Sequence, residues 1–354
     1  MRILLLTEHL GSCDGSSTHV HNLASMLTHM GHTVTIVAGD IDGDYEGPES
    51  VLVVEMRELS HRRRSMLRFA RGHLHLAVRW KRLRPDVVHA HHYYAAMMVL
   101  PICTVHGIPL LQSQHAFLER RGVLPPCPAR RIVAMSAAIH DSIVDVLMVQ
   151  ASKVFTVPYG TSVDVALNLM ATNETGPVRL LFAGRLTEQK GPQVLLDALS
   201  LIGDGLEYQC IIAGDGPLHN AIRESAFSTL PHVEVLGSCL DMAPLYAWAD
   251  ICIFPFTSSE PFGLVTIEAG SYGKAVIVTD VPYQNTIITH EENGLLVPPG
   301  DAPALAQAIQ TLGSDGVARA RLGNALRGTV SSKYSLEVMT RYIVQHYQAL
   351  RELS

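Results

Sequence analysis

Short runs of apolar residues alternate with longer amphipathic segments along nearly the whole chain. In the first half, the apolar runs predict strands at 2–7, 33–38, 51–55, 86–90, 109–113, 131–135 and 153–157. Apolar residues at helical spacing predict helices between them, at 18–30, 64–84, 93–105 and 137–148. Strands that alternate with helices form βαβ units with right-handed crossovers. The first half is therefore expected to be an α/β domain with a parallel sheet.

The alternation stops at 159–177, which is polar, carries turn residues and predicts an interdomain linker. It then resumes with strands at 178–183, 207–213, 233–236, 250–254, 275–278 and 294–297. Helices are predicted at 190–201, 216–228, 241–248, 263–272, 302–312, 316–329 and 335–351. We thus expect an N-terminal domain at 1–158, a C-terminal domain at 178–334, and a final helix, 335–354, that packs back on the N-terminal domain.

Composition agrees with two well-filled cores. The chain has 354 residues, of which 47% are hydrophobic and 17% charged, which argues against disorder. The formal net charge of -6 argues against a nucleic-acid partner, because such proteins present a basic surface. The six cysteines are scattered, mostly in apolar stretches, and no pair has metal-ligand spacing. Reduced thiols and a cytoplasmic location are therefore expected.

The N-terminus begins with an apolar run, Met1–Leu6. A run of this length is shorter than the apolar region of a signal peptide. No stretch reaches the roughly 18 apolar residues that a membrane-spanning helix needs. The run is therefore interpreted as a buried first strand.

The loop after this strand is the first candidate site. It contains Gly15, Ser16 and Ser17 and leads into the first helix. Glycine lets the backbone approach a ligand, and a helix N-terminus favours an anion. The alternative is a simple turn in which Ser17 or Thr18 caps the helix.

A second candidate site follows the first strand of the C-terminal domain. Gly184 ends that strand, Arg185 follows at once, and Lys190 precedes Gly191 at the start of the next helix. Two cations at the carboxyl end of a parallel strand suit a diphosphate, since Arg grips it with two hydrogen bonds and Lys adds a mobile charge. The alternative is a pair of solvated surface cations.

The third candidate is the segment Glu260–Ala269. Pro261 suits the first turn of a helix, so that amides near Gly263 and Leu264 would be free to bind phosphate oxygens. Glu260 could accept hydrogen bonds from sugar hydroxyls, or merely complement the helix N-terminus. Glu268 lies in an apolar helix, where an unpartnered carboxylate would be costly, so a partner or ligand is expected.

These segments resemble the retaining glycosyltransferases of the large GT-B family 4. The resemblance runs in family order over almost the whole length. It is carried by Asp86–His91, Val157–Gly160 with Asp164, Gly184–Arg185 with Lys190–Gly191, Ala213–Pro217, Glu260–Ala269 and Asn293–Val297. It implies the GT-B fold, in which two Rossmann-like parallel-sheet domains face each other across a cleft.

The resemblance also implies residue roles. Arg185 and Lys190 match the cations that bind the donor diphosphate, Glu260 the carboxylate that holds the transferred sugar, and Glu268 the one that holds the ribose. His115 matches the histidine near the reacting sugar. The implied catalytic set is His115, Glu260, Arg185 and Lys190. Donor contacts are implied for Gly15, Gly184, Arg185, Lys190, Glu260, Phe262, Gly263, Leu264 and Glu268, and acceptor contacts for Ser16, Ser17, His91 and Ser136. Ser136 could equally be a helix N-cap.

Two departures from the family pattern leave the acceptor open. Members commonly have Gly-Gly followed closely by Glu in the first loop, where this chain has Asp14–Ser17. Members also have a second Gly-Gly, at the position where this chain has Pro282–Tyr283. This chain has Thr286 where a Glu is common in the family.

The expected reaction follows from this resemblance. It is transfer with retention of anomeric configuration, without a metal ion and without any cofactor besides the nucleotide sugar. Family frequency favours a UDP-sugar such as UDP-N-acetylglucosamine or UDP-glucose. The acceptor would be a small molecule, such as a natural product or aminocyclitol, or a lipid-linked glycan. The alternatives are a GDP-mannose-dependent mannosyltransferase acting on a lipid, a nucleotide-sugar 2-epimerase, and a catalytically silent nucleotide-sugar-binding partner.

The segment 61–84 holds a cluster of basic residues among apolar ones, as in an amphipathic helix. It is interpreted as a crossover helix with a solvated basic face. The alternative is peripheral contact with the inner face of a membrane, or with a phosphorylated lipid acceptor.

Overall fold

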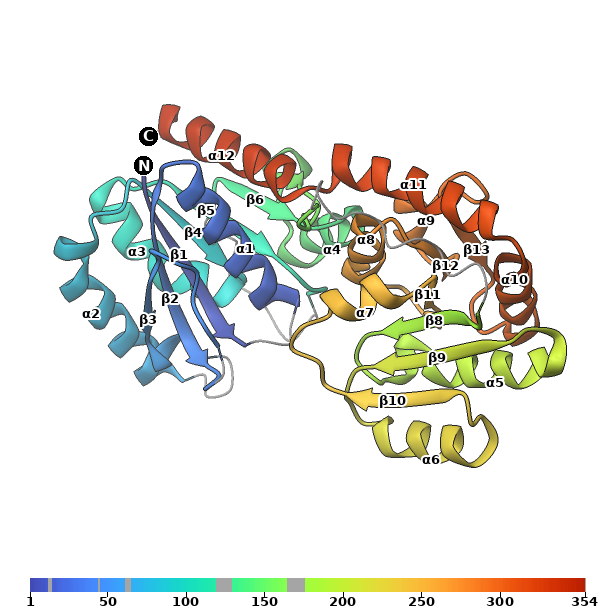
Figure 1. Ribbon diagram of the computed structural model, residues 1–354. Coiled ribbons are helices and arrows are strands. Elements are labelled where there is room, and N and C mark those ends of the chain that lie inside the picture. Colours follow the sequence, from blue (N-terminus) through green and yellow to red (C-terminus); the bar gives the residue numbers. More distant parts are fainter. Residues whose placement is uncertain (12–14, 44, 61–64, 119–128, 164–175, 354) are drawn as a thin grey trace. The chain divides into compact units, whose positions relative to one another are not determined.

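The computed structural model describes residues 1–11, 15–43, 45–60, 65–118, 129–163 and 176–353 (Figure 1). The chain forms two compact units. Unit 1 comprises Met1–Gly160 and Leu336–Ser354, and unit 2 comprises Thr161–Ser335. The last helix, α12 (Leu336–Glu352), thus belongs to unit 1 although it follows unit 2 in the sequence.

Unit 1 is built on a seven-stranded parallel sheet of order β3-β2-β1-β4-β5-β6-β7. The strands are β1 (Arg2–Leu10), β2 (Thr33–Ile41), β3 (Leu52–Glu55), β4 (Val87–His91), β5 (Leu110–Gln114), β6 (Arg131–Ala134) and β7 (Val154–Thr156). Its other helices are α1 (Gly15–His29), α2 (Met66–Leu83), α3 (Tyr93–His106) and α4 (Ala137–Leu147). Helix α1 packs against α12, and α2 packs against α3.

Unit 2 has a six-stranded parallel sheet of order β10-β9-β8-β11-β12-β13. Its strands are β8 (Val178–Ala183), β9 (Tyr208–Ala213), β10 (Val233–Gly237), β11 (Ile251–Phe254), β12 (Ala275–Thr279) and β13 (Leu295–Val297). Its helices are α5 (Pro192–Ile202), α6 (His219–Thr229), α7 (Ala243–Trp248), α8 (Leu264–Ser271), α9 (Gln284–Ile287), α10 (Ala302–Ser314) and α11 (Gly316–Lys333). Apolar residues of β8, β9 and β11 form its core with α5 and α10.

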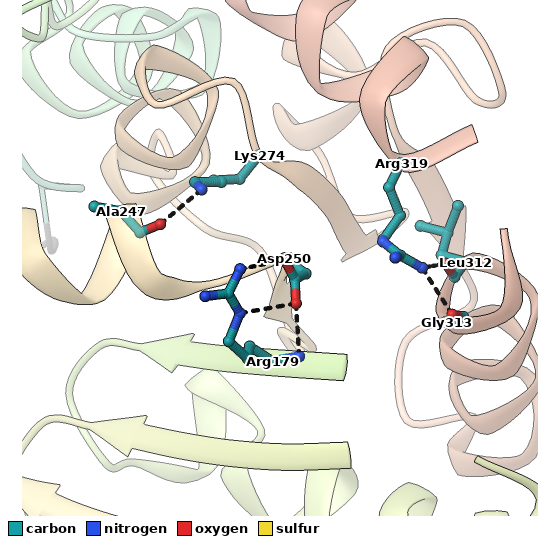
Figure 2. Close-up of polar contacts among 7 residues, drawn as sticks. All are labelled: Arg179, Ala247, Asp250, Lys274, Leu312, Gly313 and Arg319. Atoms are coloured by element: carbon teal, nitrogen blue, oxygen red, sulfur yellow. Dashed lines mark hydrogen bonds and ion pairs between the residues drawn. The ribbon is translucent and has the colours of Figure 1, made fainter. Parts of the chain in front are cut away.

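Two arginines with polar partners stabilise the frame of unit 2 (Figure 2). Arg179, at the start of β8, binds Asp250 with Nη2–Oδ1 and Nε–Oδ2 distances of 2.8 and 3.0 Å. The Arg319 guanidinium donates to the carbonyls of Leu312 and Gly313, both at 2.7 Å, at the end of α10. These cations have protein partners and therefore serve the fold.

The predicted architecture of two parallel-sheet α/β domains is confirmed, and β8 has the predicted bounds. The first helix begins at Gly15 instead of 18, so the alternative in which Ser17 or Thr18 caps it is wrong. Most of the predicted linker, 164–175, lies outside the described residues. Among the described helices, none combines the length and the apolar character needed to cross a membrane.

Candidate active site

In unit 2, the loop after β8 exposes a cation at the carboxyl edge of the sheet. Strand β8 ends at Ala183, and Arg185 is exposed two residues later. The neighbouring loop after β9 lies directly against this turn, because a Cβ on Gly214 would approach the carbonyl oxygen of Gly184 to 1.9 Å. Only glycine allows that contact, so the two loops pack closely at the edge of the sheet. The exposed side chain of Arg185 can therefore reach a ligand there.

Lys190 is positioned by a second glycine. It ends a short 3₁₀ turn, Glu188–Lys190, and Gly191 follows in the left-handed region with φ 68°. A Cβ on Gly191 would come within 1.9 Å of the carbonyl oxygen of Pro255, so the start of α5 packs directly on the segment after β11. The Lys190 ammonium therefore lies over the ring of Phe256, 5.0 Å from its centroid.

Lys190 and Glu260 form an ion pair, with Nζ 2.6 Å from Oε2. Their side chains are only 22% and 11% exposed, so water screens the pair weakly. Both residues were predicted separately as site residues, and the structure brings them together. The pair holds a carboxylate and an ammonium at one point beyond the carboxyl ends of the strands, where ligands of parallel α/β sheets bind.

The N-terminus of α8 adds an anion-binding element. The helix begins at Leu264, and Gly263 before it is left-handed, with φ 84° and no capping side chain. A Cβ there would lie 1.9 Å from Nε2 of Gln284. The first-turn amides are thus left without a side-chain cap, and the helix dipole favours an anion beside them. Pro261 was predicted in the first turn of this helix, which was wrong, because the turn at Gly263 delays the helix start.

Gln284 supports this turn and was missed from the sequence. Its Nε2 donates to the carbonyl of Phe262 at 3.3 Å, and its Oε1 accepts from the Thr266 hydroxyl at 2.8 Å. Gln284 is fully buried at the start of the four-residue helix α9. The sequence around Gln284 gives little indication that its side chain supports the turn before α8, about 20 residues earlier in the chain.

The expected partner of Glu268 is Tyr246 of α7. The Tyr246 hydroxyl donates to Oε2 of Glu268 at 2.8 Å. Burial raises the pKa of Glu268 above its usual value, and the hydrogen bond from Tyr246 opposes part of that rise. The carboxylate therefore has one oxygen fixed by a tyrosine and a second available to a ligand hydroxyl.

In unit 1, histidines gather at the carboxyl ends of β4 and β5. His91 ends β4, His115 follows β5, and their Nδ1 and Nε2 atoms are 2.9 Å apart. The other nitrogen of His115, Nδ1, is 2.8 Å from the Tyr159 hydroxyl. The ring of His19, from α1, lies 5.0 Å from both His115 and Tyr159.

These histidines are held neutral. Burial lowers the pKa of His19 to about 3, and burial with neighbouring histidines keeps the pKa of His91 and His115 well below the usual range. Within the described part of the chain, both ring nitrogens of His19 and Nε2 of His91 have no hydrogen-bond partner. Neutral imidazoles with unused nitrogens suit hydroxyl groups, which both donate and accept.

The same rings have the chemistry of metal ligands. His19, His91 and His115 each offer one ligand atom, and these atoms lie within 4.8 Å of one another. Imidazole nitrogen suits zinc and other transition metals. Sequence reasoning missed His19 and Tyr159, although His19 stands one turn into the helix that follows the first glycine loop.

Two of the three serines expected at the acceptor, Ser17 and Ser136, have local structural roles. Ser17 is fully buried and its hydroxyl accepts from the amide of Gly11 at 2.9 Å, which fixes the end of the β1 loop. Ser136 caps α4 by accepting from the Ile139 amide at 3.4 Å, so the capping alternative describes it. Gly15 is exposed at the first position of α1, and Ser16 is half-buried beside it.

Comparison with known proteins adds the family. Residues 13–165 match the model of Glycosyltransferase Family 4, and residues 177–315 match that of Glycosyl transferases group 1. The chain is 25% identical to glycogen synthase of Mycobacterium tuberculosis over 99% of its own length and 95% of that protein. It is 29% identical to the phosphatidyl-myo-inositol mannosyltransferase of Mycobacterium leprae, covering 75% and 74% of the two chains.

A solved structure shows the same fold. The crystal structure of Anabaena HepE in complex with UDP and glucose superposes with a TM-score of 0.78. The superposition covers 98% of this chain and 99% of that chain, at 18% sequence identity. The two parallel-sheet units of the present chain therefore have the GT-B arrangement of strands and helices.

Proposed function

The chain belongs to the family 4, group 1 glycosyltransferases, and from this premise we propose a retaining, metal-independent transfer of a sugar from a UDP-sugar to an acceptor hydroxyl. That the enzyme is a GT-B glycosyltransferase using a nucleotide sugar follows from the family. The donor, the acceptor and the stereochemistry are the content of the proposal. The observation that supports it most directly is the Lys190–Glu260 contact near the uncapped N-terminus of α8.

Unit 2 is proposed to bind the donor. Arg185, Lys190 and the amides at Gly263 and Leu264 would surround the diphosphate, which carries the negative charge that grows as the sugar leaves. Charge that develops beside preorganised donors is stabilised without reorganisation. Glu268 would accept a hydrogen bond from a ribose hydroxyl through the oxygen that Tyr246 leaves available.

Glu260 and His115 are proposed to bind the transferred sugar. Glu260, fixed by its ion pair with Lys190, accepts from hydroxyl groups, and neutral His115 can bind a hydroxyl or carbonyl oxygen without adding charge. In the proposed step, the bond between the anomeric carbon and the diphosphate oxygen breaks, and the acceptor oxygen bonds to that carbon on the same face. The acceptor proton passes to the departing phosphate oxygen, so no side chain needs to act as a covalent nucleophile.

UDP is favoured as the donor nucleotide. The HepE structure of the same fold holds UDP and glucose, which supports a uridine donor such as UDP-glucose or UDP-N-acetylglucosamine. The similarity to a mannosyltransferase supports GDP-mannose as the second candidate. The acceptor is proposed to be a small molecule or a lipid-linked glycan, and glycogen synthase shows that a glucan acceptor also occurs among relatives.

Thermal stabilisation by UDP, GDP, ADP and TDP tests the donor, with magnesium or with EDTA. A ligand at a hundred times its dissociation constant adds about 2.7 kcal/mol to the free energy of unfolding. We expect a shift with UDP that EDTA leaves unchanged. A shift with GDP alone would replace UDP by GDP-mannose, and no shift with any nucleotide would refute the donor site.

Stereochemistry and reaction class are read from proton NMR of the products. A product with the anomeric configuration of the donor would support retention, and inversion would exclude it. Incubation of the donor without acceptor, followed by analysis of the sugar, distinguishes a transferase from a 2-epimerase.

A further inference from the structure

Helix α2 of unit 1 presents an unusual outer surface. Met66, Leu67, Leu74 and Val78 are all exposed, with exposed fractions between 62% and 86%. Helices on soluble domains usually place such residues inward, and clustered exposed apolar residues mark interaction sites. The apolar face of α2 thus remains uncovered by the described part of unit 1.

The same helix is strongly basic. Its cations are Arg68, Arg71, Arg79, Lys81 and Arg82, followed directly by Arg84, and no acidic residue lies between Ser65 and Pro85. Among the described residues, neither Arg79 nor Arg82 has an ion-pair partner. The helix is therefore a local region of positive charge on a protein of net charge -6. Residues 62–64, three arginines at the start of the predicted basic segment 61–84, lie outside the described residues.

A cavity opens beside this helix. It has a volume of about 480 Å³ and lies between the C-terminal half of α2 and the strands β1, β2 and β3. Leu4, Leu52, Val54 and Leu83 supply much of its apolar lining. Leu52 is 57% exposed, so the described residues leave the β3 side of the cavity partly open to solvent.

Arginines stand among the apolar residues of this cavity. Arg2, Arg79 and Arg82 all contribute to its lining. Arg2 is fixed by Asp86, with Nη2–Oδ1 at 3.3 Å, and its side chain is still 52% exposed. An apolar cavity combined with guanidinium groups is complementary to an amphiphile that has an apolar chain and an anionic head.

A second cavity shares Arg2 and Pro85 with the first. Its volume is about 490 Å³, and its charged lining also includes the cations Lys81, Arg84 and Arg351 and the carboxylate of Asp86. Arg84 is the residue after the last turn of α2 and has a left-handed backbone conformation. Its side chain is fixed by a hydrogen bond from Nε to the Lys81 carbonyl at 3.0 Å. Two cavities with cations therefore flank the end of an exposed amphipathic helix.

We infer that α2 and the cavity beside it form a docking surface for an anionic phospholipid membrane, with an acyl chain or apolar tail in the cavity and a phosphate at Arg79 and Arg82. Basic amphipathic helices bind anionic lipid surfaces through buried apolar area and electrostatic attraction. The inference goes beyond the proposed transfer reaction and would place the enzyme where lipid-linked acceptors reside. It uses no residue of the donor site, so the two proposals fail separately.

Vesicle flotation tests this surface with the full-length protein and no donor. We expect binding to phosphatidylcholine vesicles that contain phosphatidylglycerol, no binding to pure phosphatidylcholine, and loss of binding in high salt. Each cation near an anionic surface contributes about fivefold to affinity, so Arg79→Glu with Arg82→Glu should weaken binding at least about tenfold. The matched control is Arg223→Glu with Lys333→Glu, two exposed cations of unit 2.

The cavity is tested separately. Val54→Phe fills it, and we expect weaker vesicle binding with unchanged stabilisation by UDP, which shows that the variant is folded. Quenching by lipids brominated on the acyl chain reports proximity, because Trp248→Phe leaves Trp80, beside the second cavity, as the sole tryptophan. We expect quenching that Val54→Phe reduces.

Any of the following results would overturn the inference. They are equal binding to neutral vesicles, binding that the Arg79/Arg82 reversal leaves unchanged, and self-association through α2 in place of lipid binding. Inorganic phosphate that releases the protein from vesicles at millimolar concentration would show a simple anion site instead of a membrane surface.

Discussion

Glu260 and Lys190 are 70 positions apart in the chain, and their charged atoms are 2.6 Å apart in unit 2. The contact depends on Gly191, because a Cβ at that position would collide with the carbonyl oxygen of Pro255. A backbone that only glycine permits therefore sets the distance between a cation suited to a diphosphate and a carboxylate suited to a sugar.

Replacement of either partner should stop transfer. We expect Glu260→Ala and Lys190→Ala to lower kcat by at least about 10²–10³-fold, the range found when one preorganised electrostatic contact is removed. Circular dichroism should show a folded chain. The matched control is Glu188→Ala, an exposed carboxylate in the same turn as Lys190. Near-normal turnover in either site variant would remove the pair from the active site.

Replacement within the Arg179–Asp250 pair should lower stability and leave turnover unchanged, the reverse of the effect expected for Lys190 and Glu260. The Arg179 and Asp250 side chains are 15% and 2% exposed, and both Asp250 oxygens are engaged by Arg179 (Figure 2). Removal of one partner of a buried pair costs about 3–5 kcal/mol. We expect Asp250→Ala to lower the free energy of unfolding by this amount in urea titration, with kcat per folded molecule unchanged. A loss of kcat without loss of stability would contradict the assignment of this pair to the frame.

The sequence predicted the sheets of this chain well because parallel strands buried on both faces are nearly continuous apolar runs. The predicted strand at 178–183 coincides with β8, an apolar run in which Arg179 is the one polar residue. Helix α9 was missed because its four residues are too few to show a period.

The site was predicted in part. Glycine, charge and strand ends indicated Arg185, Lys190, Glu260 and Gly263 from local spacing alone. Their partners were not predictable, because Tyr246 and Gln284 reach the site from other elements through contacts that no local pattern encodes. Sequence spacing likewise does not show that three histidines from α1, β4 and the end of β5 converge.

Glu268 should combine a binding role with a cost in stability. Burial raises the pKa of this carboxyl in the folded state, so folding favours its protonated form. Above the ordinary pKa of 4.5 its charge therefore destabilises the free protein, and the penalty disappears in more acidic solution. We expect Glu268→Gln to raise the free energy of unfolding at pH 7 and to weaken UDP binding about 10–100-fold.

Calorimetry with UDP and urea titration at pH 7 and pH 4 measure both effects. Tyr246→Phe serves as the companion variant. It removes the hydrogen bond that lowers the pKa of Glu268, so the acid limb of UDP binding should move to higher pH. Unchanged UDP affinity in Glu268→Gln would assign the carboxylate a structural role only.

His115 should affect turnover more than nucleotide binding. We expect His115→Ala to lower kcat about 10²-fold with UDP affinity within about twofold of wild type, since it would bind the transferred sugar. Because the pKa of His115 is held well below its usual range, the pH profile of kcat should show no step near 6.5. His115→Gln, which keeps a neutral donor and acceptor, should restore part of the activity. His29→Ala, at the exposed end of α1, is the control, and unchanged turnover in His115→Ala would remove its role.

His19 should make the protein sensitive to acid. Burial lowers the pKa of His19 from 6.5 to about 3, so the unfolded chain binds a proton more readily between these values. The stability that depends on neutral His19 is complete above pH 6.5 and is lost as the pH falls towards 3. His19→Phe should therefore reduce the slope of unfolding free energy against pH in this window by up to about 1.4 kcal/mol per pH unit. Because the ring nitrogens of His19 lack partners among the described residues, the same change should cost little stability at pH 7.

Urea titrations at pH 7, 6 and 5 measure the slope, with His29→Phe as the exposed control. Parallel slopes for wild type and His19→Phe would show that His19 is hydrated or ligand-bound in solution, and would direct attention to the metal-ligand geometry that it shares with His91 and His115.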